Sequence, residues 1–585
     1  MMWFWGRYGR SGRSITIGSA VSNAPNSGLK PSLKRIGLTA VLGFGIFAQP
    51  ALAVFSNDQH ARLGHGLASS SGPVRNVEHF DRVAMGSALR ILANQKTILK
   101  AFARKSENAT VLQFYEEREW QPAWIEGGTF NLRARAIIDK ISRAEEEGLD
   151  PEDYSLPDGS FGEAIGMSPI AIAEAEMRLS VAVLRYVIHL QTGRVDPRKI
   201  SRLITSKPQK PDTIAALNSL ALTANPVAVL ESFSPPHPGY LKLKMLLAKL
   251  RLSNLPVEPM EPIASGKSLK LGMSGPRVAH LRKRLKIAAA NVGDTIKYDE
   301  ALFSAVKSFQ ESADLTVDGI AGAKTIARLN ATIPGDPIAD VIANMERWRW
   351  LPRDLGSYHV HVNIPEFTVR IMDDGAISHQ TRVVVGKPAN QTPIFSDEME
   401  YIVVNPYWNV PRSIATKELL PKIRANPSRF MRAKGYQVVS RGRVVHPRSI
   451  NWRGVNMRSI RIRQKPGARN ALGQVKFMFP NKHAVYLHDT PSKSLFNKTV
   501  RAFSHGCVRV LNPMEFADAL LSMETKLNGK RLRKAIGGKQ KHYNLSDHIP
   551  VHLTYFTVAV NDDGDMQRFG DIYGHHRKLL DALNL

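Results

Sequence analysis

The spacing of apolar residues changes along the chain, and the change separates a helical part from a β-rich part. Between residues 88 and 252 apolar side chains recur every three or four positions, as in Met177–Gln191, which predicts amphipathic helices. From Tyr358 to Gly386 the period is two, which predicts consecutive strands with a hairpin near Asp374. The expected fold class is therefore multidomain, with a helical N-terminal domain and a β-rich C-terminal domain.

Prolines and glycines mark the boundaries between these parts, and a chain of 585 residues is too long for one hydrophobic core. A polar, Gly/Ser-rich leader, expected to be flexible, precedes the helical domain. A Pro-rich linker follows that domain and leads to a small compact module. The predicted boundaries are 54–85 for the leader, 86–254 for the helical domain, 268–331 for the module, 357–560 for the β-rich domain and 561–585 for a C-terminal extension.

A basic block interrupts the strand pattern of the β-rich domain. Residues 411–470 contain sixteen lysines and arginines but a single acid, Glu418, and so hold about half of the net charge of +29. The strand pattern resumes at Ala484–Leu487. We interpret the block as an insertion into the domain; the alternative is a solvated basic surface.

The N-terminus has the pattern of an export signal at residues 1–53. Lys34 and Arg35 precede an apolar run that ends near Ala48, and Ala51-Leu52-Ala53 is a small-x-small cleavage pattern. Cleavage after Ala53 would place the chain in the periplasm or cell envelope. The alternative is an uncleaved membrane anchor, because roughly twenty apolar residues suffice to span a bilayer.

The high positive charge indicates an acidic partner. Nucleic acid is excluded as that partner, because the chain is predicted to be exported and contains no recognisable nucleic-acid-binding module. The acidic polymers of the cell envelope fit better. Contact with a membrane is expected only if the N-terminal segment stays uncleaved.

Cys507 is the single cysteine of the chain, and its neighbours are those that a nucleophile needs. Cysteine catalysis requires a thiolate, an imidazole to take the proton and backbone N–H groups to hold the oxyanion. Imidazoles stand at His488 and His505, and Gly506 allows a close approach of substrate to the backbone. A helix start at Asn512 would favour the thiolate through its positive end. The alternative is a buried structural cysteine.

These residues resemble a family signature. The set His488, Ser504, His505, Gly506, Cys507 and Arg509 is similar to the signature of the L,D-transpeptidases (YkuD-type domains), which remodel bacterial peptidoglycan. Residues 268–331, with Asp318-Gly319-x-x-Gly322-x-x-Thr325, resemble the three-helix peptidoglycan-binding module, which can also serve as a spacer. The helical domain resembles the scaffold of the larger Gram-negative members, and the block at 411–470 resembles their lid over the active site.

The resemblance implies that His488 is the base for Cys507, with its ring oriented by a backbone carbonyl near Asp489. Sequence position agrees, because His505 is two residues from Cys507 on a tight turn, where side chains point apart. The backbone N–H groups of His505, Gly506 and Cys507 would form the oxyanion hole. Further candidates for substrate binding are Ser504, Arg509, Tyr486, Trp408 and Asn405.

Two of these candidates have alternatives. Arg509 suits a substrate carboxylate because of its planar fork, and the alternative is a structural ion pair. Trp408 is either a pocket wall or a core residue.

The reaction that the resemblance implies is a two-step acyl transfer. Cys507 forms a thioester with the third residue of a tetrapeptide stem and releases D-Ala, and an amine of a neighbouring stem then forms a 3→3 cross-link. No metal or other cofactor is required, and His359, His361, His575 and His576 do not form a convincing metal site. Alternative acceptors are an envelope protein or water, and an alternative of another class is a non-enzymatic scaffold that binds peptidoglycan.

Overall fold

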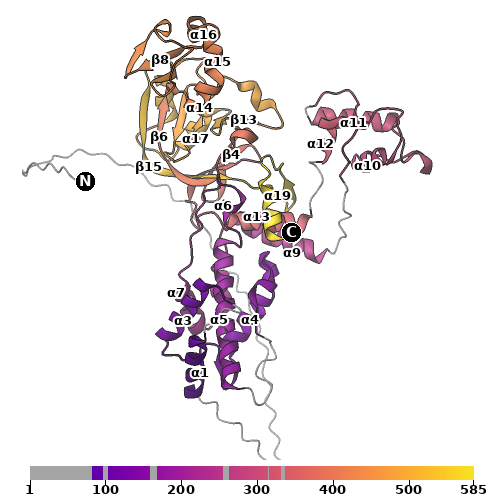
Figure 1. The fold of residues 1–585 in the computed structure, drawn as a ribbon, viewed down its shortest axis with the longest axis vertical. Coiled ribbons are helices and arrows are strands. Elements are labelled where there is room, and N and C mark those ends of the chain that lie inside the picture. The colour runs from indigo at the N-terminus through magenta and orange to yellow at the C-terminus, as the bar shows by residue number, and fades with distance from the viewer. Residues whose placement is uncertain (1–81, 96–102, 158–167, 254–261, 314, 331–335) are drawn as a thin grey trace, which may run out of the picture. The chain divides into compact units, whose positions relative to one another are not determined.

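The computed structural model describes residues 82–95, 103–157, 168–253, 262–313, 315–330 and 336–585. The predicted export segment at 1–53 and most of the predicted leader lie outside the described residues. Within the described segments the fold is multidomain, as expected, with a helical scaffold, a small helical module and a β-rich domain (Figure 1). No helix in these segments has both the length and the apolar character needed to cross a membrane.

The scaffold is organised around α5 (Pro169–Thr192), a long helix that is buried along most of its length. Ser168 caps its first turn by accepting from the N–H of Ala171. The helices α1 (Arg82–Asn94), α3 (Lys105–Glu117), α4 (Leu132–Ser142) and α7 (Thr213–Leu222) pack around it (Figure 1). The remaining scaffold elements are β1 (Ile125–Glu126), β2 (Thr129–Phe130), η1 (Ala144–Glu147), η2 (Pro151–Tyr154), α6 (Pro197–Ile200), α8 (Pro226–Glu231) and α9 (Pro238–Leu252).

The scaffold begins earlier than the sequence suggested. Helix α1 starts at Arg82, so residues 82–85 are helical and the prediction of a flexible leader was wrong for these four positions. The reason is tertiary packing, since Met85 and Leu89 are buried in the scaffold core. Burial of these two side chains stabilises a first turn that sequence pattern alone did not reveal.

The small module contains α10 (Pro276–Arg284), η3 (Val292–Asp294), α11 (Glu300–Ser312) and α12 (Ala323–Asn330). It has its own core, which includes Leu281, Leu302 and Leu329. The turn before α12 is held by Asp318, which accepts hydrogen bonds from the N–H of Ile320 and from Gln310, at 2.9 and 2.8 Å. This compact core accounts for the module's pattern of apolar residues.

The β-rich domain is a closed barrel. Among the described residues, nine strands form one sheet in the order β13-β5-β14-β12-β11-β6-β15-β3-β4, and pairing of β4 with β5 closes it. The predicted hairpin joins β4 to β5. The strands are β3 (Tyr358–Asn363), β4 (Thr368–Asp373), β5 (Ala376–Gly386), β6 (Phe395–Val404), β11 (Val475–Met478), β12 (Leu487–His488), β13 (Ala502–Ser504), β14 (Val508–Val510) and β15 (Lys541–Thr554).

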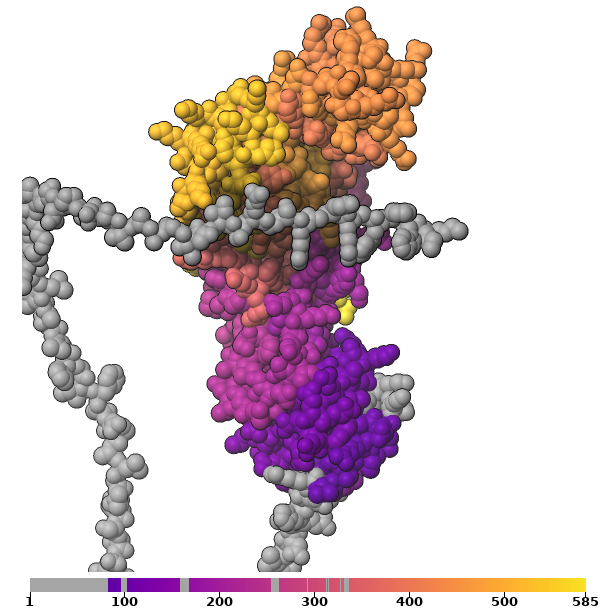
Figure 2. All heavy atoms as spheres, turned by 90° about the vertical axis from the view of Figure 1, so that its left-hand side faces the viewer, coloured from indigo at the N-terminus to yellow at the C-terminus, as the bar shows by residue number. Residues whose placement is uncertain are grey.

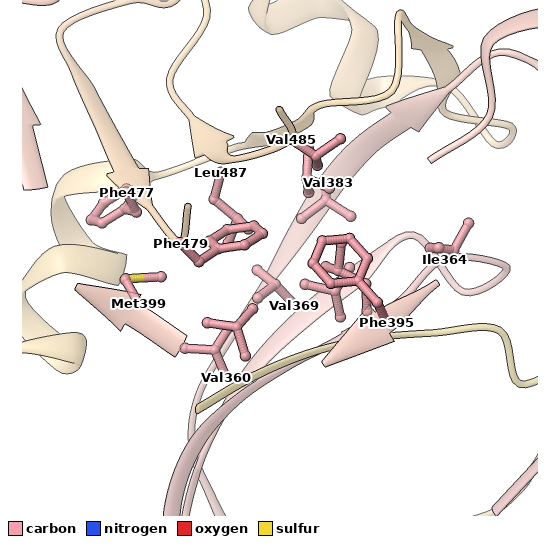
Figure 3. Packing of buried hydrophobic residues seen from close by; sticks show 14 of the residues in the cluster. Val360, Ile364, Val369, Val383, Phe395, Met399, Phe477, Phe479, Val485 and Leu487 are labelled. Carbon is pink, nitrogen blue, oxygen red and sulfur yellow. The ribbon is translucent and has the colours of Figure 1, made fainter. Parts of the chain in front are cut away.

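Alternating residues of these strands fill the barrel. Val360, Val383, Phe477 and Leu487 all point into one apolar core (Figure 3). Helix α17 (Pro513–Leu520) adds Phe516, whose ring lies edge-on to Phe477 with 5.0 Å between centroids. Because successive side chains of a strand point to opposite faces, the residues between these core positions lie on the outer face of the barrel wall.

The C-terminal part differs from the prediction in one strand and in one loop. The expected strand at 551–560 is divided, with β15 ending at Thr554 and β16 (Val558–Val560) pairing with β17 (Met566–Arg568). The division arises because the N–H of Thr557 donates to the side chain of Asn344 on α13 (Pro337–Trp348). A helix, α18 (Gly529–Ala535), replaces part of the expected basic loop.

Residues 561–585 belong to the core of the barrel domain rather than to an extension. Their helix α19 (His575–Leu583) buries Leu579 and Leu583 in the barrel's hydrophobic cluster, together with Tyr573. The polar composition of this segment concealed these few apolar anchors.

The basic block at 411–470 is a folded subdomain. It contains α14 (Arg412–Ile414), the π-helical turn η5 (Ala415–Leu419), α15 (Leu420–Ala425), α16 (Pro427–Lys434), β8 (Tyr436–Ser440), β9 (Arg443–Val445), η6 (Pro447–Ser449) and β10 (Ile460–Gln464). Ile423, Val438 and Ile462 are buried in a separate cluster. Its strands form a four-stranded sheet in the order β7-β10-β8-β9, to which β7 (Trp408–Asn409) contributes from just before the block. In the space-filling view the block forms a lobe, drawn in orange (Figure 2).

Candidate active site

The candidate site lies on the outer face of the barrel wall, where β12 and β14 run parallel. Leu487 is paired with Val508 and points inward, so the neighbouring pair His488 and Arg509 points outward. On the other side of β12, Lys476 of β11 is the direct partner of His488. The sheet register therefore places three basic side chains in a row across three strands.

Cys507 precedes β14 and is partly exposed. Its sulfur lies 3.9 Å from the carbonyl oxygen of Ala484, and the backbone N–H and hydroxyl of Tyr486 both hydrogen-bond the thiol. Burial raises the pKa of the Cys507 thiol above its ordinary value, although Tyr486, Arg509 and Lys476 act in the opposite direction. The expectation that the helix after Asn512 favours the thiolate stays a prediction.

His488 is buried, and its orientation is fixed by the chain. Its Nδ1–H donates to the backbone carbonyl of Asp489 at 2.5 Å, as expected, which leaves Nε2 without a proton in the neutral ring. Burial and the nearby cations Arg509 and Lys476 lower the pKa of His488 to about 3. The imidazole is therefore neutral and able to accept a proton.

The carboxylate of Asp489 holds the backbone rather than a reacting group. It accepts hydrogen bonds from the N–H of Gln474 at 2.9 Å, the N–H of Thr490 at 2.7 Å and Nζ of Lys493 at 2.7 Å. The backbone of Gly473 passes so close that a Cβ there would lie 2.2 Å from the carboxylate. These contacts fix the carbonyl to which His488 donates.

Ser504 is a buried structural residue, and the prediction that it binds substrate is corrected. Its hydroxyl donates to the carbonyl of Cys507 at 2.6 Å and accepts from the N–H of Gly506 at 3.1 Å. Gly506 adopts φ of +115°, a conformation that side-chain-bearing residues rarely take. Because its N–H is engaged by Ser504, Gly506 does not present that group to a substrate.

A second layer of residues, which sequence reasoning missed, supports this loop. The hydroxyl of Thr392 donates to the carbonyl of Gly506 at 2.8 Å and accepts from the N–H of Gly386 at 2.9 Å. The hydroxyl of Tyr573 donates to the carbonyl of Gly386 at 2.6 Å. Tyr573 thus connects the C-terminal segment to the loop that carries Cys507. No local motif signals either residue.

The side chains of His505 and Cys507 have different partners. Nε2 of His505 lies 2.6 Å from Oε1 of Glu418, the single acid of the basic block. The block is therefore in direct contact with the loop that carries Cys507. In the sequence, Glu418 stands out only as the single acidic residue of the basic block.

Arg509 has no carboxylate partner among the residues that the structure describes, so the alternative of a structural ion pair finds no support there. Its Nε is buried and makes no hydrogen bond, and burial lowers the pKa of its guanidinium. A buried guanidinium without a partner is costly, and a bound carboxylate would relieve that cost. Its neighbours are the thiol of Cys507 and the ring of His488.

Of the other residues predicted to bind substrate, one lies at the site and two are engaged elsewhere in the chain. Tyr486 lies beside both Cys507 and His488, with 5.6 Å between the Tyr486 and His488 rings. Trp408 packs against the core of the basic block, which agrees with the alternative of a core residue. Asn405 is buried, its amide donates to the carbonyl of Ala535, and its oxygen accepts from another backbone N–H. Asn405 is therefore occupied within the chain, and the expectation of a pocket wall is corrected.

Three family models match this chain. The L,D-transpeptidase catalytic domain (YkuD) matches residues 357–527, a scaffold domain matches 109–247, and the family described as "Putative peptidoglycan binding domain" matches 274–329. A Haemophilus influenzae protein described as "Putative L,D-transpeptidase" is 34% identical over 240 residues, which are 40% of this chain and 48% of that protein. The match thus spans about half the length of that relative.

Two solved structures are also similar. An L,D-transpeptidase from Xylanimonas cellulosilytica is 17% identical and covers 50% of this chain and 100% of its own, with a TM-score of 0.15. The Ldtfm-avibactam carbamoyl enzyme is 13% identical and covers 34% of this chain and 49% of its own, also with a TM-score of 0.15. With TM-scores this low, neither structure supports an assignment.

The catalytic-domain model covers the barrel strands from β3 to β14. The chain carries an L,D-transpeptidase (YkuD) catalytic domain together with a scaffold domain and a peptidoglycan-binding domain.

Proposed function

We propose that this protein is a peptidoglycan L,D-transpeptidase that uses Cys507 as its nucleophile and His488 as its base. The observation that carries the proposal is the geometry of the outward face of β12 and its neighbours. On that face the thiol of Cys507 lies beside the guanidinium of Arg509, which has no carboxylate partner among the described residues. His488 of β12 is paired with Arg509 across the two strands, and its neutral imidazole donates its Nδ1–H to the backbone carbonyl of Asp489. The peptidoglycan-related domains imply an extracytoplasmic location.

The first step forms a thioester. Nε2 of His488 takes the proton of Cys507, and the sulfur attacks the carbonyl carbon of the third residue of a tetrapeptide stem. The oxyanion is held by the N–H groups of His505 and Cys507, since that of Gly506 is engaged by Ser504. The proton on His488 then passes to the nitrogen of the departing D-Ala, and the amide bond breaks.

Arg509 is proposed to bind the carboxylate of that D-Ala. Its planar fork offers two parallel hydrogen bonds to a carboxylate, and its buried Nε has no partner within the described chain. Binding at this point would require a free C-terminal carboxylate next to the bond that breaks. It would also place a negative charge in a site that is otherwise positive.

The second step transfers the acyl group. An amine of a neighbouring stem attacks the thioester, gives up its proton to His488 and forms an amide, and the thiol of Cys507 is regenerated with that proton. The product is a 3→3 cross-link, and no metal or cofactor takes part in either step.

The proposal is tested by intact-mass spectrometry of the protein mixed with a disaccharide-tetrapeptide. The expected result is an adduct on Cys507 that equals the substrate minus D-Ala, together with 3→3 dimers. Cys507→Ala should give neither, and it should unfold at the same temperature as the unmodified chain. An adduct without dimers would contradict the proposed acceptor and lead to protein amines or water. If the thiol is accessible and forms no adduct, the proposal that the protein is an L,D-transpeptidase is wrong.

A further inference from the structure

Two cavities lie where the scaffold meets the barrel, and they share a wall. One has a volume of about 830 Å³ and extends along the C-terminal half of α5, and the other, of about 460 Å³, borders the barrel. Thr205, Ser206, Lys207 and Lys482 line both cavities. Together they form one groove, which we call the junction groove.

The groove is built on a fixed connection between the two domains. Ile204 of the scaffold forms a parallel bridge with Ile394 of the barrel, and the N–H of Thr205 donates to the carbonyl of Ile394 at 2.9 Å. The hydroxyl of Thr205 also lies 3.1 Å from Nε2 of His483. Main-chain hydrogen bonds of this kind hold the groove open without help from a ligand.

The groove has an excess of positive charge that the chain does not neutralise. Lys207, Lys210 and Lys482 are exposed, and none of them is paired with a carboxylate in the described part of the chain. The acids of the larger cavity are already occupied, since Glu107 pairs with Arg185 at 2.7 Å and Asp196 pairs with an arginine beside it. The smaller cavity has one acid in its lining, Asp397, against the two lysines that it shares with the larger one.

Ser206 lines both cavities of the groove and also a third cavity, beside Arg347 and Trp350. Its Oγ is buried and has no hydrogen-bond partner in the described part of the chain.

The groove leads to the candidate active site through one short loop. The side chain of Asn481 braces this loop by donating to the carbonyl of Val485 at 2.8 Å and accepting from the N–H of His483 at 3.0 Å. Asn481, Lys482 and His483 line the groove, and the next residue, Ala484, presents its carbonyl to Cys507 at 3.9 Å. This loop therefore connects the wall of the groove to the surroundings of the thiol.

We propose that the junction groove binds the stem-peptide carboxylates of a peptidoglycan strand, beyond the stem that reacts at Cys507. Lys207, Lys210 and Lys482 contact those carboxylates. This assignment rests on the proposed function, and it makes the scaffold part of the substrate-binding surface. It predicts a preference for strands with several stems over a single stem.

The test compares two triple variants of the full chain. The first, Lys207→Glu, Lys210→Glu and Lys482→Glu, reverses the charge at three positions of the groove. The second, Lys249→Glu, Lys530→Glu and Lys578→Glu, makes the same change in net charge at exposed lysines outside it. Each set is also placed on Cys507→Ala, so that binding of soluble, multi-stem peptidoglycan fragments is measured by calorimetry without turnover.

The groove variant should bind the multi-stem fragments about tenfold or more weakly than the control variant, with a smaller salt dependence. Both variants should form the thioester with a disaccharide-tetrapeptide at the unmodified rate, which separates the groove from the chemistry. Equal binding by the two variants would overturn the proposal, as would equal competition by inorganic phosphate and by the fragments. If the unmodified chain forms no thioester while the groove result holds, the proposed reaction fails and the binding site stands.

Discussion

Glu418 and His505 are joined by a contact of 2.6 Å between Oε1 and Nε2, although they are 87 positions apart in the chain. Glu418 is the single acid of a subdomain that is otherwise basic, and His505 is two residues from Cys507. The contact turns the imidazole of His505 toward the subdomain, and it leaves His488 as the histidine that the sheet places on the same face as the thiol.

Replacing the two histidines should therefore have unequal effects. His488→Ala should slow thioester formation by about 10²–10⁴-fold, because general-base catalysis contributes that much. His505→Ala should slow it by less than about tenfold, since this ring is bonded to Glu418. Single-turnover mass spectrometry of Cys507 measures both rates. A larger loss from His505→Ala would mean that the base is misassigned.

The basic subdomain should act on substrate binding more than on the thiol. Replacing residues 411–470 with a short linker should raise KM for peptidoglycan fragments and leave the reaction of Cys507 with a small alkylating reagent within about threefold. The milder change Glu418→Gln alters only the contact between Glu418 and His505, and Lys417→Gln serves as its neighbouring control.

The outcome against this lid hypothesis is an equal loss of substrate binding and thiol reactivity in the shortened chain. In that case the subdomain would stabilise the active-site loop itself.

Tyr573 should support the catalytic loop from the C-terminal segment. Tyr573→Phe removes the hydroxyl that donates to Gly386 and keeps the ring in the core. The free energy of unfolding should therefore fall by about 1–2 kcal/mol. Thioester formation should slow, because Gly386 and Thr392 position Gly506. Thermal unfolding and the single-turnover rate are the two measurements, and an unchanged rate would show that the loop does not depend on this bond.

Acid should destabilise the chain through histidines that are buried between the scaffold and the barrel. Burial lowers the pKa of His237 and of His552 to about 4, and His359 lies beside His552 with 5.3 Å between rings. An unfolded histidine has a pKa near 6.5, so the unfolded chain binds more protons between pH 6.5 and 4. The stability that depends on neutral rings is complete above about pH 6.5 and is lost as the pH falls toward 4.

For each of these two rings, the free energy of unfolding should fall by about 2 kcal/mol between pH 7.5 and pH 5. Urea unfolding at the two pH values measures this change. His552→Gln should reduce the pH dependence, because an amide keeps polar contact with Ser396 without titrating. A chain equally stable at both pH values would contradict this account.

The sequence by itself determined the features that repeat or that are contiguous. Strand alternation in Tyr358–Gly386, the helix start at Asn512 and the segment from Ser504 to Arg509 are local patterns, and each was found where it was predicted. The identity of Cys507 and His488 as candidate residues was available for the same reason. Their signature has fixed spacing along the chain.

Only the tertiary structure decided which side chains are occupied and which are free. Ser504 and Asn405 carry the same polar groups as substrate-binding residues, but their hydrogen bonds are used within the chain. Thr392 and Glu418 contact the catalytic loop from 114 and 87 positions away, and Tyr573 supports it by bonding Gly386, which is 187 positions from Tyr573. Hydrogen bonds between such distant segments require one side chain on each and leave no periodic pattern in the sequence, so they become visible only when the barrel closes.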